Sequence, residues 1–207
     1  ILQTLKKTFE SEQVEEKRFE NIGPTISAEL RRKSVSAIVL VCLFIVLYIA
    51  FAFRKVSRQI GAWKFGVCAV IALVHDVSIP IGLFAVLGKF AGVEVDTLFV
   101  TALLTILGFS VHDTIVVFDR VRENIVRNPS LPFADVVNTA VNQTIARSIN
   151  TSLTTLLAVL AILFFGGEYT RYFALALAVG IFVGTYSSIF LASPLLVSWH
   201  GFAHRQR

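Results

Sequence analysis

The sequence has 207 residues, of which 55% are hydrophobic and 16% are charged. An ordinary soluble domain carries about 25% charged residues, so this composition excludes that class and favours a protein with several membrane spans. In such a protein the formal net charge of +5 sets the membrane topology and is not a sign of nucleic-acid binding.

The chain opens on a charged stretch that precedes the first apolar run. Residues 1–20 carry charges at helical spacing, and the sequence contains no methionine. We expect residues 1–33 to be the end of an extracytoplasmic domain and the lead-in to the membrane, in a fragment or a processed product. Residues 34–200 are predicted to form a transmembrane domain, and residues 201–207 a cytoplasmic tail.

Five apolar stretches are long enough to cross a bilayer, for which a helix needs about 20 residues. They are Val35–Phe53, Phe65–Leu87, Val95–Phe118, Ile149–Phe165 and Tyr172–Trp199. The fourth stretch is short, and its start is expected to extend back through a polar turn at Gln143–Ser148. The pattern predicts an all-α membrane protein with five transmembrane helices.

Lys and Arg are unevenly shared between the two sides of these spans. Nine occur in the loops after the first and third spans and in the tail, against two in the glycine-containing turns after the second and fourth. Because cytoplasmic loops are rich in Lys and Arg, the long loops and the C-terminus are predicted to be cytoplasmic and the N-terminal segment extracytoplasmic. Arg31, Arg32 and Lys33 run against this assignment, although residues 1–33 are nearly balanced, with six acids and seven bases.

Asp113 and Arg147 are the main candidates for a functional pair inside the membrane. An ionised Asp near the centre of a spanning helix costs about 2.5–3.5 kcal/mol, so it needs a partner or a proton. Asp113 lies six residues before Asp119, which is about 9 Å from the cytoplasmic end, and Arg147 enters the fourth span from the same side. The two side chains are predicted to meet directly or through water, and a carboxyl that alternates between a proton and a guanidinium can couple energy. The alternative is a permanent structural ion pair.

Threonines accompany both candidates at helical spacing. Thr151 and Thr154 lie four and seven residues after Arg147, and Thr105 belongs to a stripe that ends at His112. These positions predict a polar track beside the pair. The alternative is that the hydroxyl groups only hold helices together.

The second span holds a carboxyl of its own, Asp76, four residues before Pro80. Pro80 cannot donate a hydrogen bond to the Asp76 carbonyl, so the helix is expected to bend there. The two residues form either a hinge that carries a proton-binding carboxyl or a kink whose Asp stays protonated and bonds a neighbour. Each Asp follows a His, but adjacent helical residues point about 100° apart, so we expect no metal site.

The fifth span carries small residues at a regular spacing of four, namely Ala176, Gly180, Gly184, Ser188 and Ala192. Small residues at this spacing let another helix approach closely. Gly180, Gly184 and Ser188 are therefore predicted to be helix-packing positions.

Four ordered motifs resemble those of one family. "GFSVHDTIVVFDRVREN" together with "NQTIARSINTSLTT" closely resembles the SecF family of protein-export membrane proteins, including the SecF half of fused SecDF proteins. "ENIGPTISAEL", before the first span, and "ALVHDVSIPIG", in the second, are similar to further signatures of that family. The resemblance covers nearly the whole chain, but not the family's first membrane helix or most of its extracytoplasmic domain.

The resemblance implies a resistance-nodulation-division fold, with this chain forming the last five of six helices in one half. It implies a partnership with SecD beside the SecYEG channel in the bacterial inner membrane. It further implies that the proton-motive force helps to draw translocating preproteins outward after the SecA motor has pushed them in. The family residues implicated in proton conduction correspond to Asp113 and Arg147, and the role of His112 stays open.

The resemblance implies no cofactor and no covalent chemistry, so an enzyme is not expected. Two other classes remain as alternatives: a proton-driven efflux transporter of the same superfamily, and a passive scaffold of the translocon. An efflux transporter usually has two homologous halves, whereas this chain holds one. An intramembrane hydrolase is least favoured because no nucleophile–base pair is visible.

Overall fold

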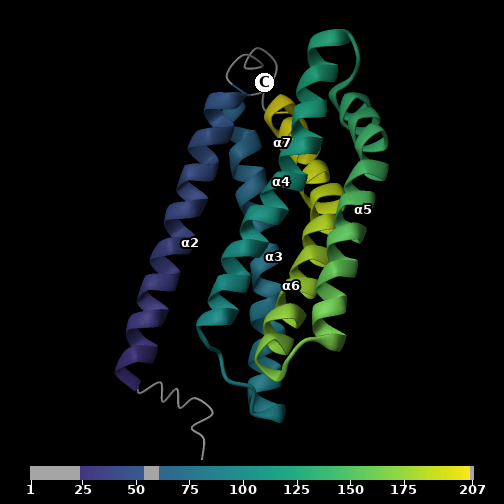
Figure 1. The fold of residues 1–207 in the computed structure, drawn as a ribbon. Coiled ribbons are helices and arrows are strands. Elements are labelled where there is room, and N and C mark those ends of the chain that lie inside the picture. Colours follow the sequence, from purple (N-terminus) through teal and green to yellow (C-terminus); the bar gives the residue numbers. More distant parts are fainter. Residues whose placement is uncertain (1–23, 54–60, 206–207) are drawn as a thin grey trace, which may run out of the picture. The chain divides into compact units, whose positions relative to one another are not determined.

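Helices form all the regular structure in the part of the chain that the computed structural model describes, residues 24–53 and 61–205. Helix η2 is a π-helix, and α6, η2 and α7 follow one another without a break. The helices are α2 Pro24–Ala52, α3 Ala62–Ala91, α4 Thr97–Arg127, α5 Phe133–Phe165, α6 Glu168–Ser187, η2 Ser188–Ala192 and α7 Ser193–Arg205 (Figure 1).

Five helical segments within the described residues are long and apolar enough to cross a membrane. Each corresponds to one predicted span, which confirms the all-α membrane architecture. The segments are Arg32–Ala52, Ala62–Ala91, Thr97–Arg127, Phe133–Phe165 and Glu168–Phe202.

By its internal contacts the chain divides into two units, residues 1–35 and residues 36–207. The described part of the first unit is the beginning of α2, which starts at Pro24, inside the predicted lead-in. The predicted helical charge pattern of residues 1–20 lies outside the described residues. Helices α3 to α7 belong wholly to the second unit.

The turn between α3 and α4 is set by one glycine and one aspartate. Gly92 ends α3 with a φ of 66°, a backbone conformation that glycine adopts without steric cost. Asp96 caps α4, and its side chain accepts a 2.8 Å hydrogen bond from the Phe99 amide. The predicted tight turn therefore has a local cause at each end.

The fourth span extends back through Gln143–Ser148, as expected, and it reaches further, because α5 runs without interruption from Phe133. Helix α4 likewise continues to Arg127, so the long loop between the third and fourth spans reduces to residues 128–132. The two polar extensions pack on each other, and Asn124 donates a 3.1 Å hydrogen bond from its side-chain amide to Gln143. Polar residues can continue a helix where a neighbouring helix satisfies them.

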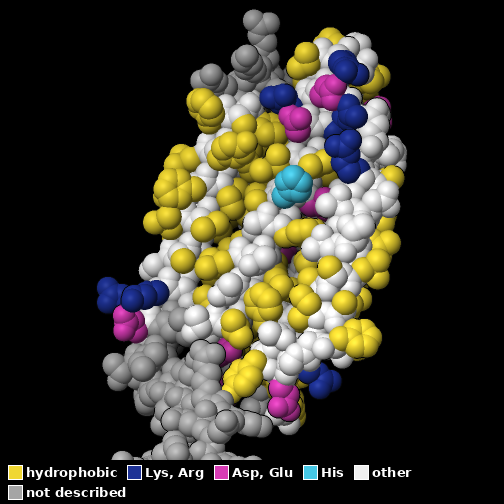
Figure 2. Space-filling model, viewed as in Figure 1, with side chains coloured by type: hydrophobic (Ala, Val, Ile, Leu, Met, Phe, Trp, Pro, Cys, Tyr) yellow, Lys and Arg dark blue, Asp and Glu magenta, His cyan; other side chains and the backbone are white. Residues whose placement is uncertain are grey.

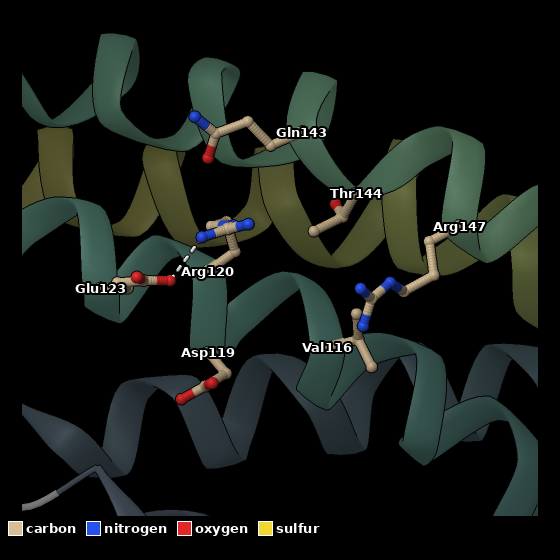
Figure 3. A pocket seen from close by; sticks show the side chains of 7 residues that line it. All are labelled: Val116, Asp119, Arg120, Glu123, Gln143, Thr144 and Arg147. Atoms are coloured by element: carbon tan, nitrogen blue, oxygen red, sulfur yellow. Dashed lines mark hydrogen bonds and ion pairs between the residues drawn. The ribbon is translucent and has the colours of Figure 1, made fainter.

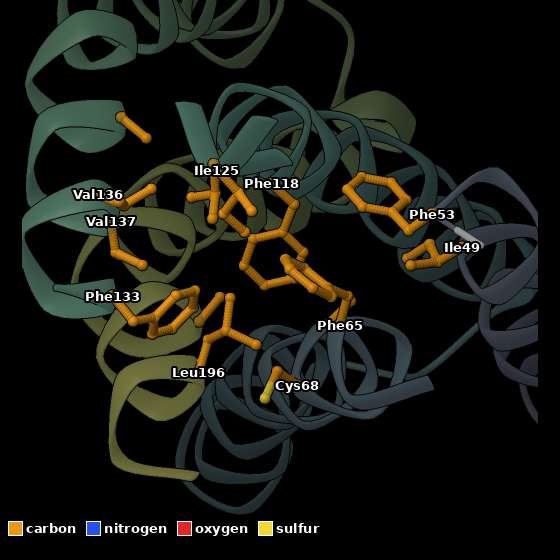
Figure 4. Packing of buried hydrophobic residues seen from close by; sticks show 14 of the residues in the cluster. Ile49, Phe53, Phe65, Cys68, Phe118, Ile125, Phe133, Val136, Val137 and Leu196 are labelled. Carbon is orange, nitrogen blue, oxygen red and sulfur yellow. The ribbon is translucent and has the colours of Figure 1, made fainter. Parts of the chain in front are cut away.

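Buried apolar side chains form two clusters at different heights of the second unit. The first lies toward the end that carries the C-terminus, and it includes Phe65, Phe118 and Leu196 (Figure 4). The second lies toward the opposite end, and it includes Phe84, Ile106 and Ile181. Helix α4 contributes to both clusters and packs against α3, α5 and α6.

Two glycines let α6 lie close against α4. A Cβ added at Gly180 would collide with the Ile106 side chain, and one added at Gly184 would lie 3.0 Å from the Ser110 Cβ. Both glycines are buried. This close approach brings the end of α6 against the middle of α4.

The π-helix η2 has a local cause in Pro194, the second residue of α7. A proline has no N–H, and in a regular α-helix its ring would collide with the carbonyl four residues earlier, that of Phe190. A π-helical turn widens the backbone at such a point. The Ser193 hydroxyl donates to the Ser188 carbonyl oxygen at 3.1 Å, so the widened turn keeps that acceptor satisfied.

Candidate functional site

A layer of buried polar side chains separates the two apolar clusters. Along α4, α5 and the continuous α6–η2–α7 helix, the polar residues fall between the residues of one cluster and those of the other. On α3, Asp76 lies at the near edge of the second cluster, between Leu73 and Val77. We call this set the polar layer: Asp76, Ser110, Asp113, Thr114, Ser148, Ser152, Ser187 and Ser188. Two carboxyl groups in the middle of membrane-spanning helices make it the candidate site.

Asp113 lies on α4 with 5% of its surface exposed. The Ser188 hydroxyl, at the start of η2, is 3.4 Å from its Oδ2 atom and can donate to it. The Ser148 hydroxyl of α5 lies near the same carboxyl, and it is buried with no hydrogen-bond partner of its own among the described residues. Asp113 therefore faces hydroxyl groups from two neighbouring helices.

Asp76 lies on α3 and is fully buried. Its Oδ2 atom accepts hydrogen bonds from Ser110 of α4 and from Ser187 of α6, the latter at 2.7 Å. Its Oδ1 atom lies 3.0 Å from His75 Nδ1, which donates in the tautomer that carries a proton there. One carboxyl thus holds three helices together.

Arg147 lies on the outer surface of α5, beside a cavity of about 260 Å³ between α4 and α5. The cavity is lined by Val116, Asp119, Arg120, Glu123, Gln143, Thr144 and Arg147 (Figure 3). In Figure 3 the Arg147 guanidinium extends toward Val116. Because Ser148 is the next residue and lies near Asp113, the backbone of Arg147 stands at the height of the polar layer.

Among the described residues, the ion pairs do not include one between Arg147 and Asp113. Nearby cations of α4 pair with acids of the same helix, Arg120 with Glu123 and Arg122 with Asp119. One residue step around a helix turns a side chain by about 100°, which explains why Ser148 faces the carboxyl and Arg147 does not. The predicted contact of Asp113 with Arg147 stays a prediction.

The predicted threonine track lies on the surface, outside the polar layer. Thr105, Thr151 and Thr154 are exposed. Thr105 donates to the Thr101 carbonyl at 2.8 Å, and Thr154 donates to the Thr151 carbonyl at 2.9 Å. Each of these two hydroxyls therefore bonds its own helix.

His112 is exposed on the same helix as Thr105. Among the described residues, no group of three or more His, Cys, Asp or Glu side chains could hold a metal ion. Pro80 lies inside α3, which continues through it to Ala91. Its role as a hinge stays a prediction.

A family model described as protein export membrane protein SecD/SecF, C-terminal, matches residues 1–201. The chain belongs to the SecD/SecF family. It is 54% identical over 197 residues to a protein translocase subunit SecF from Thermobaculum terrenum, an alignment that covers 95% of the chain and 61% of the relative. It is 48% identical over 180 residues to a protein translocase subunit SecDF from Thermus thermophilus, covering 87% of the chain and 23% of the relative.

A solved SecDF structure, described as the crystal structure of SecDF in super-membrane-facing form, is similar in fold. The TM-score is 0.77 and the sequence identity 42%, over 99% of this chain and 26% of the other. The chain spans about three fifths of the length of the SecF relative from Thermobaculum terrenum. The SecD/SecF family and the multi-pass membrane fold are thus established for this chain.

Three serines of the polar layer were not predicted from the sequence as site residues. Ser110, Ser148 and Ser187 lie in apolar or mixed stretches that many membrane helices contain. Ser110 lies three residues before Asp113, on the same side of α4. That spacing is the signal that could have identified Ser110, whereas Ser148 and Ser187 lie on other helices.

Proposed function

We propose that the chain is the SecF-type membrane part of a protein-export machine that uses the proton-motive force to promote preprotein translocation. The observation that carries this proposal is the burial of Asp113 in a polar layer between two apolar clusters. A carboxyl at that depth is costly unless it is paired, bonded or protonated. A residue whose charge is both costly and partly satisfied can change its protonation state when the helices around it repack.

The cavity beside Arg147 supports a route for the proton. Glu123 and Asp119 line it together with Arg147, and it lies between α4 and α5, the two helices that carry Asp113 and Ser148. We propose that Arg147 reaches Asp113 when the carboxyl is ionised and withdraws when it is protonated. A proton that crosses a potential of 100 mV releases about 2.3 kcal/mol, enough to bias two arrangements of the helices.

The distribution of Lys and Arg supports one orientation of the chain in the membrane. Arg120, Arg122 and Arg127 stand at the end of α4 that leads into residues 128–132, and Lys and Arg gather at that end of the visible face (Figure 2). We propose that this end and the C-terminus face the cytoplasm of a bacterial inner membrane. The cavity then opens toward the cytoplasm, on the side where protons are released.

The exposed polar stripes of α4 and α5 support SecD as the partner within the membrane. Thr105 and His112 are exposed on α4, and Arg147, Thr151 and Thr154 are exposed on α5. Polar and charged groups at membrane depth face protein or water and avoid lipid. We propose that a SecD subunit or fused SecD half covers these stripes, and that the pair works beside a SecYEG channel on a translocating preprotein.

The test is preprotein translocation into membrane vesicles that hold SecYEG, SecA and the SecD partner, with and without an uncoupler. Asp113→Asn keeps the size of the side chain, but the amide cannot bind or release a proton. It is therefore expected to remove the uncoupler-sensitive part of translocation. Asp135→Asn makes the same chemical change at an exposed position in the first turn of α5 and should leave that part intact. If vesicles with Asp113→Asn keep the full uncoupler-sensitive part of translocation, the chain acts as a passive scaffold in this assay.

A further inference from the structure

Two adjacent serines connect the two buried carboxyl groups. Ser187 ends α6 and Ser188 begins η2. The Ser187 hydroxyl donates to Asp76 at 2.7 Å, and the Ser188 hydroxyl lies 3.4 Å from Asp113. The peptide bond between them therefore joins the carboxyl of α3 to the carboxyl of α4 through one short piece of backbone.

The Asp76 end of this connection is fixed. Asp76 is fully buried and accepts from Ser110 and Ser187 on two different helices. Ser110 also lies opposite Gly184, since a Cβ at Gly184 would lie 3.0 Å from Ser110 Cβ. These two hydrogen bonds tie the end of α6 to α3 and α4, so Asp76 holds the end of α6 in place.

At the Asp113 end of this connection, the Ser188 hydroxyl has a choice of two acceptors. The Ser188 hydroxyl has one proton and two acceptors within reach, the Thr185 carbonyl at 2.9 Å and Asp113 Oδ2 at 3.4 Å. An ionised Asp113 draws that proton toward itself, and a protonated Asp113 leaves it with Thr185. The π-helical turn that begins at Ser188 gives this residue a backbone environment different from that of the α-helix before it.

We propose that Asp76 is a positioning residue for the proton site: through Ser187 it sets the place of Ser188, which donates to Asp113. The inference rests on the proposed role of Asp113 and adds a second carboxyl that acts through a hydroxyl pair. Asp76 does not need to exchange protons in this arrangement. Its role is to hold the junction of α6 and η2 so that the Ser188 hydroxyl stays within hydrogen-bond distance of the Asp113 carboxyl.

The charged and titratable groups around Asp113 and Asp76 are few among the described residues. Helix α3 contributes His75, α4 contributes His112, and α5 contributes Arg147 from the surface. Helix α6 and η2 face the carboxyls with serines, and Tyr186, the titratable residue just before Ser187, is exposed and stacks on Phe190. A change in pH response on removing Ser187 or Ser188 therefore arises from the loss of a hydroxyl donor and not of a charge.

The experiment measures how the uncoupler-sensitive part of translocation depends on pH, in vesicles with the full translocase. Ser188→Ala is expected to shift the pH profile by about one pH unit, the size of one lost hydrogen bond to a charged group. Ser187→Ala and Asp76→Asn are expected to shift it in the same direction by a smaller amount. Ser78→Ala is the matched control, because that exposed hydroxyl bonds the Val74 carbonyl of its own helix and should leave the profile unchanged.

The double variant Ser187→Ala/Ser188→Ala tests whether Ser187 acts on Asp113 through Ser188. If Ser187 acts through Ser188, the double variant shifts the profile no further than Ser188→Ala alone, whereas independent effects would add. Ser187→Thr, which keeps a hydroxyl, should restore the wild-type profile. Additive shifts, or wild-type profiles for Ser187→Ala and Asp76→Asn, would overturn the inference. Loss of the proposed function has a different signature, since Asp113→Asn would then keep the uncoupler-sensitive component.

Discussion

Buried hydroxyl groups among the described residues differ in what satisfies them. Ser110 and Ser187 donate to Asp76, and Thr144 donates to the Ala140 carbonyl at 2.9 Å. Thr114 is fully buried, and its hydroxyl has no hydrogen-bond partner among the described residues. A buried hydroxyl without a partner costs about 1–3 kcal/mol, so Thr114 weakens the fold where it stands beside Asp113.

Replacing Thr114 with Val should therefore raise the stability of the protein or leave it unchanged. The methyl group fills the same volume and removes the desolvation cost, so we expect a gain of up to about 1 kcal/mol in the free energy of unfolding. Thr144→Val is the matched control and should lose about 1 kcal/mol, because its hydroxyl is bonded. Unfolding in detergent would measure both, and a clear loss for Thr114→Val would mean that a water or the partner subunit satisfies this hydroxyl.

At the scale of the helices, the contact between α4 and α6 places Ser187 and Ser188 against the polar layer. Gly180 stands about two turns before these serines and faces Ile106, and Gly184 stands about one turn before them and faces Ser110. Without a side chain at these points the two helices lie close enough for hydroxyl groups to reach carboxyl groups on neighbouring helices. Any residue larger than glycine at position 180 has to displace Ile106.

Gly180→Ala is expected to lower the free energy of unfolding by about 1–3 kcal/mol, the usual cost of overpacking. Gly82→Ala provides the control, since a Cβ at that helical glycine meets nothing within 4 Å, and it should be neutral or stabilising by up to about 1 kcal/mol. Adding Ile106→Ala to Gly180→Ala should recover part of the loss. Equal stability of the two glycine variants would show that α4 and α6 are not in close contact.

At the scale of the whole molecule, the described residues expose polar groups at the depth where the two apolar clusters end. His112 and Arg147 are exposed at the height of the buried carboxyl groups. Helix α6 instead exposes apolar side chains such as Phe182, with 68% of its surface exposed. The first surface suits a protein partner and the second suits lipid.

Cysteine cross-linking in the membrane would separate these two surfaces. With Cys42 and Cys68 replaced by Ala, a cysteine at Thr105 is expected to cross-link to cysteines in the spanning helices of the SecD partner. A cysteine at Phe182 should not, because that position faces lipid in the proposed assembly. Cross-links from position 182 alone would place the partner on the other side of the molecule.

Composition and periodicity were enough to predict the five membrane-spanning helices and the all-α class, because about 20 apolar residues in a row have few other stable conformations in a bilayer. The fourth span was expected to extend back through Gln143–Ser148, but not as far as Phe133, where α5 begins. That further length was not predicted because the extension of α4 that satisfies Gln143 is not visible in the local sequence.

The buried carboxyls stood out in the sequence as Asp76 and Asp113, since charge is rare within apolar spans. Which groups surround them was decided by the tertiary structure alone. Helical periodicity places a residue on one face of its own helix, but the neighbour on that face depends on how the helices pack. Ser187 therefore meets Asp76 across 111 residues of sequence, and Arg147 turns outward while Ser148 turns toward Asp113.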